Sequence, residues 1–297
     1  MTGFRIEIVQ DVEEARKLWV KWSPGRSLYD DWDFRSCFNQ YFNYRIHFLV
    51  GYNDDIQVGI LPLQFNSEKK YLEAFGGSYM RNLCVYTKNE YRAFIPEFYK
   101  SINSRAKIVD IDSCDVNPTL LFHDFNYTIN LSEIKSIDGY LNKFLKSKER
   151  TNIKRRFKLM DSKGLFLKKN KAEDLKKLFE LNKKNFKDTS TFHFPFREKI
   201  FFNLFKKNFG NELNSFYFKD ELVCVSFAIF YKKIFYYINL GVEKDIYPHA
   251  WSFITLFNIK RSIELGATLF DAGMGDFGWK EKWGLEKKPQ YIFNNCV

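Results

Sequence analysis

Residues 264–284 read ELGATLFDAGMGDFGWKEKWG and hold the most informative turn of the chain. Gly266 ends a helical pattern, and the segment TLFDAG (268–273) follows it as a short apolar strand. The glycines Gly273 and Gly275 then permit positive φ or the close approach of a substrate. The rest of the stretch is a polar and aromatic turn or short helix. A helix, a buried strand and a glycine-rich turn in this order indicate an α/β fold.

Three runs of alternating residues precede this stretch, and we expect them to form an antiparallel meander. They read NSFYFKD, ELVCVSFAIFY and KKIFYYINLGVE over residues 214–243. The first half of the chain shows the same order of elements. A helix begins after Asp11 with a capping-box-like start at Glu14, a three-strand meander follows over 47–77, and a helix over 90–103 precedes a strand over 106–112.

The repeated order predicts two α/β (α+β) modules in tandem, residues 1–130 and residues 131–297. Each module would be a mixed, mostly antiparallel sheet flanked by helices. In the second module, residues 134–160 have a strong helical pattern that stops at Gly164. Further helical patterns cover 172–186, 195–208 and 250–265.

The composition describes a globular protein of 297 residues, with 45% apolar and 28% charged residues. These values exclude a disordered chain, a collagen and a coiled coil. The longest apolar stretch, Leu222–Tyr231, has ten residues, whereas a membrane span needs about 20. Glu7 and Asp11 lie where a secretory signal would be apolar. We therefore expect a cytoplasmic protein without stable membrane insertion.

Several common kinds of site are missing from the sequence. The five cysteines include no CxxC pair and the four histidines are scattered, so we expect buried thiols, no metal and no tightly bound cofactor. The motifs HExxH, GxSxG, Walker A and GxGxxG are also absent.

The charge of the chain is divided unevenly between the two modules. Residues 1–130 carry 15 basic and 17 acidic residues, and residues 131–297 carry 32 and 19. The excess is densest between Lys143 and Asp188. A one-sided basic surface attracts RNA, phosphorylated cofactors or an anionic membrane. The alternative is a solvated, lysine-rich helix surface.

Three stretches carry a resemblance to a known family. SKERTNIKRRFK (147–158) stands where the family has S-x-x-R-x-x-I-x-R. The pattern G-x-x-x-x-D-x-G-x-G followed by an aromatic residue, Lys and Trp matches Gly266 through Trp283. VGILPLQ (58–64) is typical of the first half of such proteins. The chain resembles the FemAB/FemX-like group of GNAT-superfamily acyltransferases, whose relatives include proteins with a BioF2-like acetyltransferase domain.

This resemblance implies transfer of an acyl or aminoacyl group, from aminoacyl-tRNA or acyl-CoA as co-substrate, to an amine-bearing small molecule or peptide. The first module would be non-catalytic, and the acceptor would bind in a cleft between the modules. The alternative function is a non-catalytic binding module for RNA or an anionic surface. The family's small, glycine-containing turn is replaced here by Tyr247-Pro248-His249-Ala250-Trp251. That replacement and the basic bias favour aminoacyl-tRNA slightly over acyl-CoA.

The site residues follow from the resemblance and from residue chemistry. Lys280, between Phe277, Trp279 and Trp283, would hold an oxyanion, a phosphate or a carboxylate; its alternative is a surface lysine packed on tryptophan. Asp271 would deprotonate or orient the amine, and its alternative is a turn cap on Gly273. The expected donor- or phosphate-binding residues are Ser147 (as helix N-cap), Arg150, Lys154, Arg155, Gly273 and Gly275. The expected substrate-pocket residues are Tyr237, Asn239, Trp279, Trp283 and Trp32, with Tyr237 and Asn239 on one face of their strand.

Overall fold

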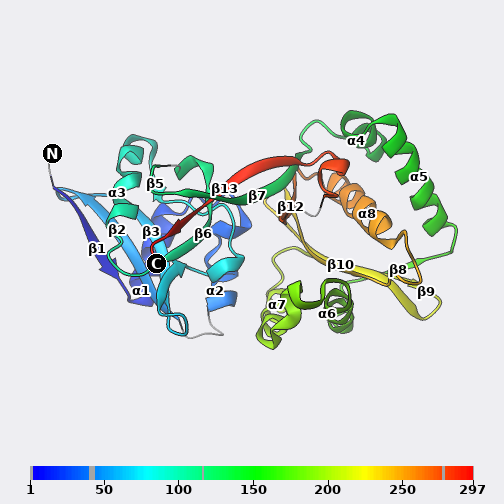
Figure 1. Ribbon diagram of the computed structural model, residues 1–297, viewed down its shortest axis with the longest axis horizontal. Helices are drawn as coiled ribbons and strands as arrows, with labels where there is room; N and C mark the ends of the chain where they lie inside the picture. Colours follow the sequence, from blue (N-terminus) through cyan, green and yellow to red (C-terminus); the bar gives the residue numbers. More distant parts are fainter. Residues whose placement is uncertain (1–2, 40–43, 116, 276–277, 297) are drawn as a thin grey trace. The chain divides into compact units, whose positions relative to one another are not determined.

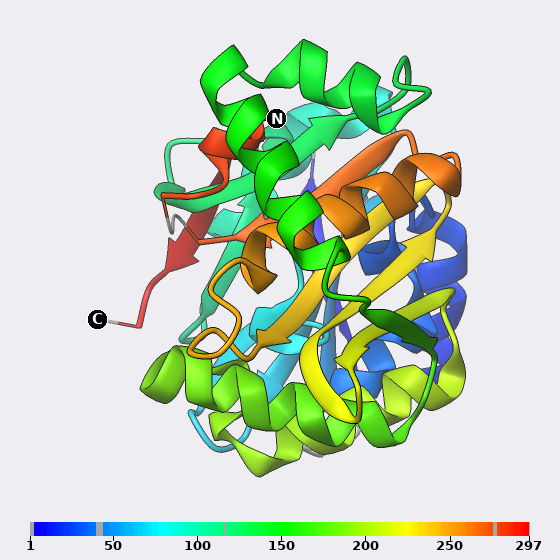
Figure 2. The ribbon, with the colours of Figure 1, turned by 90° about the vertical axis from the view of Figure 1, so that its right-hand side faces the viewer.

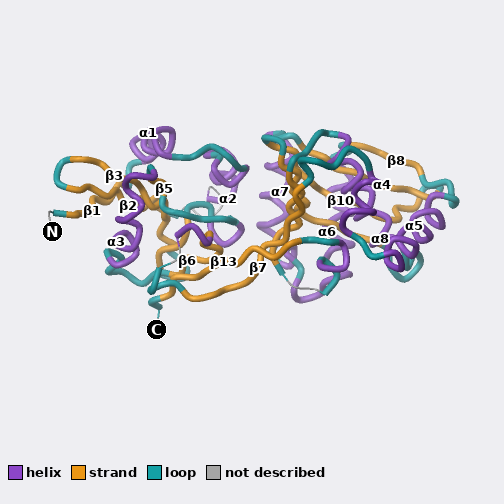
Figure 3. Tube along the Cα trace, turned by 90° about the horizontal axis from the view of Figure 1, so that it is seen from above, coloured by secondary structure: helices purple, strands orange, loops and turns teal. Residues whose placement is uncertain are grey.

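The computed structural model describes residues 3–39, 44–115, 117–275 and 278–296 (Figure 1). The chain forms two compact units. Unit 1 comprises Met1–Phe125 together with Lys288–Val297, and unit 2 comprises Asn126–Lys287. Both units combine helices with β-strands (Figure 3), so the expected α/β fold class is confirmed. The sequence placed the division at residue 130 and assigned segment 288–297 to the second module, whereas this segment packs with unit 1.

The sheet of unit 1 is antiparallel in the order β1-β2-β3-β4, and β5 also pairs with β3. A parallel bridge from Leu72 to Ala106 brings the segment before β6 beside β4. β6 in turn pairs with β13, the last strand of the chain. The strands are β1 (Phe4–Val9), β2 (Arg45–Asn53), β3 (Ile56–Asn66), β4 (Tyr71–Ala74), β5 (Tyr86–Thr87), β6 (Lys107–Asp112) and β13 (Glu286–Asn294).

The α-helices described beside this sheet are α1 (Val12–Trp22), α2 (Trp32–Asn39) and α3 (Ile95–Lys100). α1 begins as expected, because Oδ1 of Asp11 accepts a hydrogen bond of 2.9 Å from the backbone N–H of Glu14. Trp32 is partly buried and packs against the hydrophobic core of unit 1, with its ring 4.9 Å from that of Phe75 and 5.8 Å from that of Trp19. These contacts give Trp32 a packing role, and its expected place in a substrate pocket stays a prediction.

The sheet of unit 2 has the order β7-β12-β11-β10-β9-β8. β11 and β12 are parallel, and the other pairs of neighbouring strands are antiparallel. Unit 1 has the same arrangement: β4 is parallel to the segment before β6, and β6 is antiparallel to β13. β7 supplies its residues from Asn126 onward to unit 2. The strands are β7 (Leu121–Asn130), β8 (Phe166–Lys169), β9 (Asn211–Phe218), β10 (Glu221–Tyr231), β11 (Ile234–Val242) and β12 (Leu269–Met274).

The helices of unit 2 form layers on both faces of the sheet (Figures 1 and 2). α6 and α7 cover one face, where Phe201 contacts Phe227 of β10. α8 covers the other face, where Phe253 contacts Phe216 of β9, and α5 packs outside α8. The helices are α4 (Ile137–Phe144), α5 (Ser147–Asp161), α6 (Glu173–Phe186), α7 (Pro195–Lys207) and α8 (Ala250–Glu264). Short 3₁₀ turns cover Leu28–Asp30, Gly77–Tyr79, Asn89–Phe94, Ser113–Asp115, Lys187–Thr189, Thr191–His193 and Glu281–Trp283.

The helical run expected over 134–160 is interrupted between α4 and α5. Leu145 is extended (φ −116°, ψ 139°) and buried, so the chain turns to insert its side chain. The carboxylate of Glu149 then accepts a hydrogen bond of 3.0 Å from the N–H of Lys146. Lys146 therefore precedes α5 as its N-cap residue, and Ser147, the expected cap, is the first helical residue.

Two further expectations bear on the chain as a whole. Cys37 and Cys224 are buried, but Cys114 is exposed and Cys84 and Cys296 are partly exposed. The expectation that all five thiols are buried is therefore wrong. In the parts of the chain that the structure describes, no helix has both the length and the apolar character that crossing a bilayer requires.

Candidate functional site

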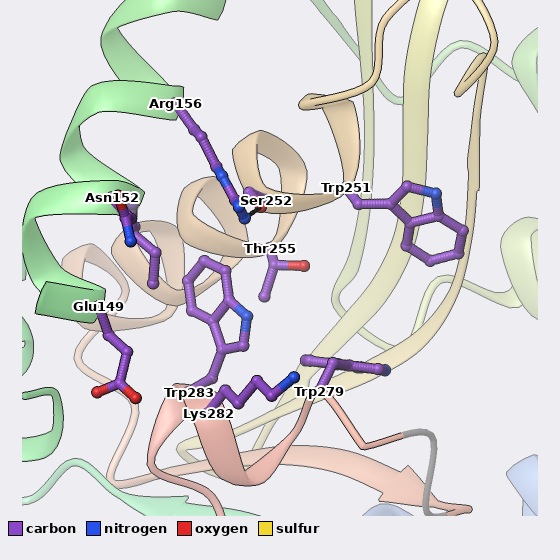
Figure 4. Close-up of a pocket in the computed structure, with 10 residues that line it drawn as sticks. Glu149, Asn152, Arg156, Trp251, Ser252, Thr255, Trp279, Lys282 and Trp283 are labelled. Carbon is purple, nitrogen blue, oxygen red and sulfur yellow. Dashed lines mark hydrogen bonds between the residues drawn. The ribbon is translucent and has the colours of Figure 1, made fainter.

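A cavity of about 430 Å³ lies in unit 2, between α5, the first turns of α8 and the turn after β12 (Figure 4). α5 contributes side chains one turn apart along one face, and α8 contributes the polar residues Ser252 and Thr255. The walls combine two cations with three tryptophans. The lining residues are Glu149, Asn152, Ile153, Arg156, Trp251, Ser252, Thr255, Trp279, Lys282 and Trp283.

The beginning of α8 gives this cavity a positive end. The first N–H groups of a helix have no partners within the helix and carry partial positive charge. Among the described residues, no side chain caps α8. Arg156 extends from α5 toward this point (Figure 4), and its Nη1 donates a hydrogen bond of 3.3 Å to Oγ of Ser252. The Nε–H of Arg156 is buried without an acceptor among the described residues, so the guanidinium has hydrogen-bonding capacity left for a ligand.

The tryptophans make the rest of the cavity aromatic. Trp283 is buried, and its carbonyl oxygen accepts a hydrogen bond of 2.6 Å from the hydroxyl of Tyr140. Trp251 lies edge-on to Phe186 at the end of α6, with ring centroids 5.7 Å apart. Cationic groups beside flat apolar rings suit a ligand that is both anionic and aromatic, such as a phosphorylated nucleoside.

The central strands separate beside the cavity. Among the described residues, the pairing of β11 with β12 runs from Ile234 to Tyr236. A β-bulge opposite Phe227 and Ala228 then adds one residue, Ile238, to β11. The alternation of side chains reverses at the bulge. Tyr237 lies beside Thr255 of α8, whereas Asn239 accepts a hydrogen bond of 2.9 Å from Asn182 of α6, on the opposite face. The expectation that Tyr237 and Asn239 share one face is therefore wrong.

Residues 147–281 match the family described as an acetyltransferase (GNAT) domain. This segment is a GNAT domain. It contains the cavity except for two lining residues, Lys282 and Trp283. The sequence-based recognition of a GNAT-superfamily protein is confirmed, and the activity class that the domain supports is acyl transfer.

Solved structures show that the whole chain has the tandem GNAT fold. It is similar to FemX over 98% of both chains, with a TM-score of 0.59 and 13% identity. The L-PGS from Bacillus licheniformis matches 97% of this chain and 92% of its own (TM-score 0.59, 12% identity). A tandem GNAT protein from the clavulanic acid biosynthesis pathway matches 98% of this chain and 97% of its own (TM-score 0.53, 9% identity). No curated protein sequence matches this chain.

Lys280 of the GNAT domain is buried and does not line the cavity. Its ammonium donates hydrogen bonds of 2.8 Å to the carbonyl oxygen of Gly273 and 2.7 Å to that of Met274. It also lies 4.7 Å from the ring centroid of Tyr127. Lys280 thus holds the turn after β12 together, and its role in transfer stays a prediction. Phe277, expected beside it, lies outside the described residues.

Asp271 has the contacts expected of a turn cap. Its Oδ1 accepts a hydrogen bond of 2.8 Å from the N–H of Gly273, and its Oδ2 accepts one of 3.3 Å from Asn126. Gly273 and Gly275 have φ of 67° and 93°, so the expected positive φ is confirmed at both. Asp271 is 3% exposed. Like Lys280, it forms hydrogen bonds that stabilise the turn after β12.

The cations chosen from the sequence lie away from the cavity. Arg155 is exposed, Arg150 is partly exposed, and Lys154 forms an ion pair of 2.6 Å with Asp138. None of these three, nor Ser147, lines the cavity. Of the expected pocket residues, Trp279 and Trp283 do line it.

The sequence analysis missed Arg156, and the helical phase of α5 contains the signal that would have found it. Ile153 and Met160 are the buried residues of α5. Arg156 lies three residues after the first and four before the second, so it faces the same side. Ser252 and Thr255 belong to a polar stripe on an otherwise apolar helix, which continues at Asn258 and Ser262.

Proposed function

We propose that this protein is an N-acyltransferase. It transfers an acyl or aminoacyl group from an activated donor, with aminoacyl-tRNA favoured over acyl-CoA, to the amine of a small molecule or peptide. The observation that carries the proposal is the cavity of the GNAT domain, where Arg156 meets Ser252 at the beginning of α8. Both candidate donors bring phosphate groups and an adenine ring, and the cavity offers cations and indole rings for them.

Direct attack of the amine on the donor carbonyl fits the residues of the cavity. Its described lining includes neither a cysteine nor a histidine, so a covalent acyl-enzyme has no support there. Glu149 brings a carboxylate to the cavity wall, although it also caps the start of α5. The chain would act mainly by holding the donor and excluding water from the carbonyl.

FemX and L-PGS have the same fold, which supports an aminoacylated donor for this chain at the level of analogy. The similar tandem GNAT protein of the clavulanic acid biosynthesis pathway was solved without AcCoA, so CoA thioesters belong among the donors tested.

The test is single-turnover transfer to a mixed panel of amines from charged tRNA and, separately, from acetyl-CoA. The decisive variant is Arg156→Ala, with Arg155→Ala as its matched control on the same helix. A lost charge-assisted hydrogen bond costs about 1.5–3 kcal/mol. With a short aminoacylated oligonucleotide ending in CCA as the donor, which does not extend to the outer side of α5, we expect donor affinity to fall roughly 10- to 100-fold in Arg156→Ala only. Equal losses in both variants would refute the assignment of the cavity as the donor site.

A second candidate function has one observation in its favour. Asp271 and Lys280 use their hydrogen bonds within the turn after β12, as they would in a GNAT-like module that binds RNA or an anionic surface without catalysis. The two functions differ in turnover. Binding of tRNA without transfer to any amine of the panel would favour the binding module.

A further inference from the structure

The edge of β11 that faces away from β10 has no neighbouring strand after Tyr236 among the described residues. The hydrogen bond from Glu243 N–H to the carbonyl oxygen of Val223 directs the odd-numbered residues of this part of β11 toward β10. The backbone groups of Leu240 and Val242 therefore point the other way. β12 does not reach them, since its pairing with β11 ends at Tyr236.

Asparagine side chains of α6 occupy this edge in place of a strand. Nδ2 of Asn185 donates a hydrogen bond of 3.0 Å to the carbonyl oxygen of Val242, and Oδ1 of Asn185 accepts one of 3.0 Å from the N–H of the same residue. Nδ2 of Asn182 donates to the carbonyl oxygen of Leu240 at 2.9 Å. Both backbone groups of Val242 and one of Leu240 are thus satisfied from within the chain.

Further contacts fix α6 in this position. Asn182 is itself held by Ser190, whose hydroxyl donates a hydrogen bond of 2.7 Å to its Oδ1. Lys184 forms ion pairs of 2.6 Å with Glu243 and 3.2 Å with Asp245, in the segment that follows β11. The ring of Phe186 contacts Trp251 of the cavity. The asparagines therefore belong to a fixed helix that borders the site.

An unpaired strand edge beside a site is where an amide-bearing arm would bind, by adding main-chain hydrogen bonds as a further strand does. The pantetheine arm of a CoA thioester contains two amides. An ester carried on the 3′ end of an RNA has no such arm. A donor of the first kind must displace Asn185 and Asn182 before it can pair, whereas a donor of the second kind need not.

We propose that Asn182 and Asn185 select the donor, by closing the edge of β11 to CoA thioesters and leaving the site to an ester carried by RNA. This inference rests on the proposed acyl transfer and concerns which carrier delivers the group. The asparagines act as specificity-determining residues and take no part in the chemical step.

The experiment measures binding of acetyl-CoA by calorimetry to the wild-type chain and to two variants. Asn185→Ala opens the edge, and Asn185→Leu removes the same hydrogen bonds but keeps the space filled. The wild type and Asn185→Leu should bind acetyl-CoA at least about tenfold more weakly than Asn185→Ala, which is the effect of one or two hydrogen bonds. Tight binding to the wild type, or equal binding to all three, would overturn the proposal.

A second measurement covers the case in which Asn185→Ala does not fold. Hydrogen exchange at the N–H of Val242 is followed in the wild type, with and without acetyl-CoA. The acetyl-CoA concentration is about 1 mM, so that it exceeds a typical micromolar dissociation constant. Unchanged exchange supports the closed edge, and increased protection contradicts it. Neither measurement depends on turnover. If charged tRNA gave no transfer, the proposed function would fail while the closed edge could still be observed.

Discussion

A side chain of a type suited to catalysis can instead hold the backbone in place by hydrogen bonds, and Lys280 is an example. Lys280 looks like a catalytic lysine in the sequence, where it stands between aromatic residues. In the structure its three donors face carbonyl oxygens and an aromatic ring. A buried ammonium requires such partners, since without them the charge would not be tolerated in the interior.

The substitution Lys280→Met should lower the stability of the protein. It leaves the carbonyl oxygens of Gly273 and Met274 without their donor, and each buried acceptor lost costs about 1–3 kcal/mol. We expect a loss of about 3 kcal/mol in urea unfolding. Lys282→Met is the control, because this exposed lysine lines the cavity and should affect donor binding instead. Unchanged stability of Lys280→Met together with lost turnover would support the predicted role of Lys280 in transfer.

Asp115 of unit 1 predicts a dependence of stability on pH. Burial raises the pKa of its carboxyl to about 6, although Val85 N–H and the Tyr99 hydroxyl donate to it at 2.6 and 2.9 Å. Because the pKa in the folded state exceeds that in the unfolded state, the folded protein binds more protons between about pH 4 and 6. Its stability should fall as the pH rises through this window.

The size of this effect is the difference between the two pKa values, about two units or roughly 3 kcal/mol. Asp115→Asn keeps an acceptor oxygen and does not titrate. Urea midpoints at pH 4 and pH 6.5 should therefore differ less in Asp115→Asn than in the wild type. An identical pH dependence of the two proteins would show that Asp115 does not titrate in this range.

At the scale of elements, the contact between α6 and β11 depends on a residue without a side chain. A Cβ at Gly241 would lie 2.6 Å from Cβ of Leu181 and 3.2 Å from the carbonyl oxygen of Leu178. The backbone of the helix therefore approaches the strand more closely than any other residue would allow. This close approach lets Asn182 and Asn185 reach the edge of β11.

Gly241→Ala should destabilise unit 2 by about 1–3 kcal/mol, because the helix must move away from the strand. The matched control is Gly139→Ala in α4, where a Cβ would meet only the hydroxyl of Ser136, at 3.3 Å. There the better helix propensity of alanine should leave stability unchanged or raise it by up to about 1 kcal/mol. Thermal unfolding of both variants makes the comparison, and equal effects would argue against the close contact.

Most elements of this fold could be predicted from local sequence, because period and caps are local signals. Asp11 and Gly266 mark helix ends in the structure as they do in the sequence. The bulge at Ile238 could not be predicted, since it depends on how β11 is aligned with β10. That one residue decides which face of the sheet Asn239 points to. The sequence therefore identified Tyr237 and Asn239 on β11 but not their position on opposite faces.

The site was predicted only in part for a similar reason. Trp279 and Trp283 were found because they adjoin a recognisable motif, and both line the cavity. Arg155 was chosen over Arg156 because the motif was read without the helical phase of α5. The role of Asn182 and Asn185 depends on contacts between elements more than 50 residues apart in sequence, as the separation of 57 between Asn185 and Val242 shows.

For the whole molecule, charge is concentrated in one unit. Unit 2 carries 31 basic and 19 acidic residues, and the exposed cations include Lys154 and Arg155 on the outer side of α5. Cations spread over a surface act on a polyanion far more than on a small ligand. Under the proposed function they would contact the RNA that carries the acyl group, whereas Arg156 lines the cavity.

Binding of charged tRNA should therefore weaken steeply with salt. If about three phosphates are neutralised, raising the salt from 50 to 200 mM lowers the affinity roughly tenfold or more. The double variant Lys154→Ala and Arg155→Ala should reduce the slope of log affinity against log salt. A short aminoacylated oligonucleotide ending in CCA serves as the control, because it should keep its affinity in this variant. An unchanged slope would mean that the outer side of α5 does not contact the RNA.

The pairing of β6 with β13 also has a consequence for how the protein is made. Unit 1 receives the strand formed by β13 only after the ribosome has translated all of unit 2. At 5–20 residues per second, this delay lasts roughly 10–30 s. Throughout it the edge of β6 is open, in a nascent chain whose apolar residues are already exposed to solvent. Unit 2 can therefore complete its fold before unit 1 does. A chaperone that covers the incomplete unit 1 should raise the yield of native protein.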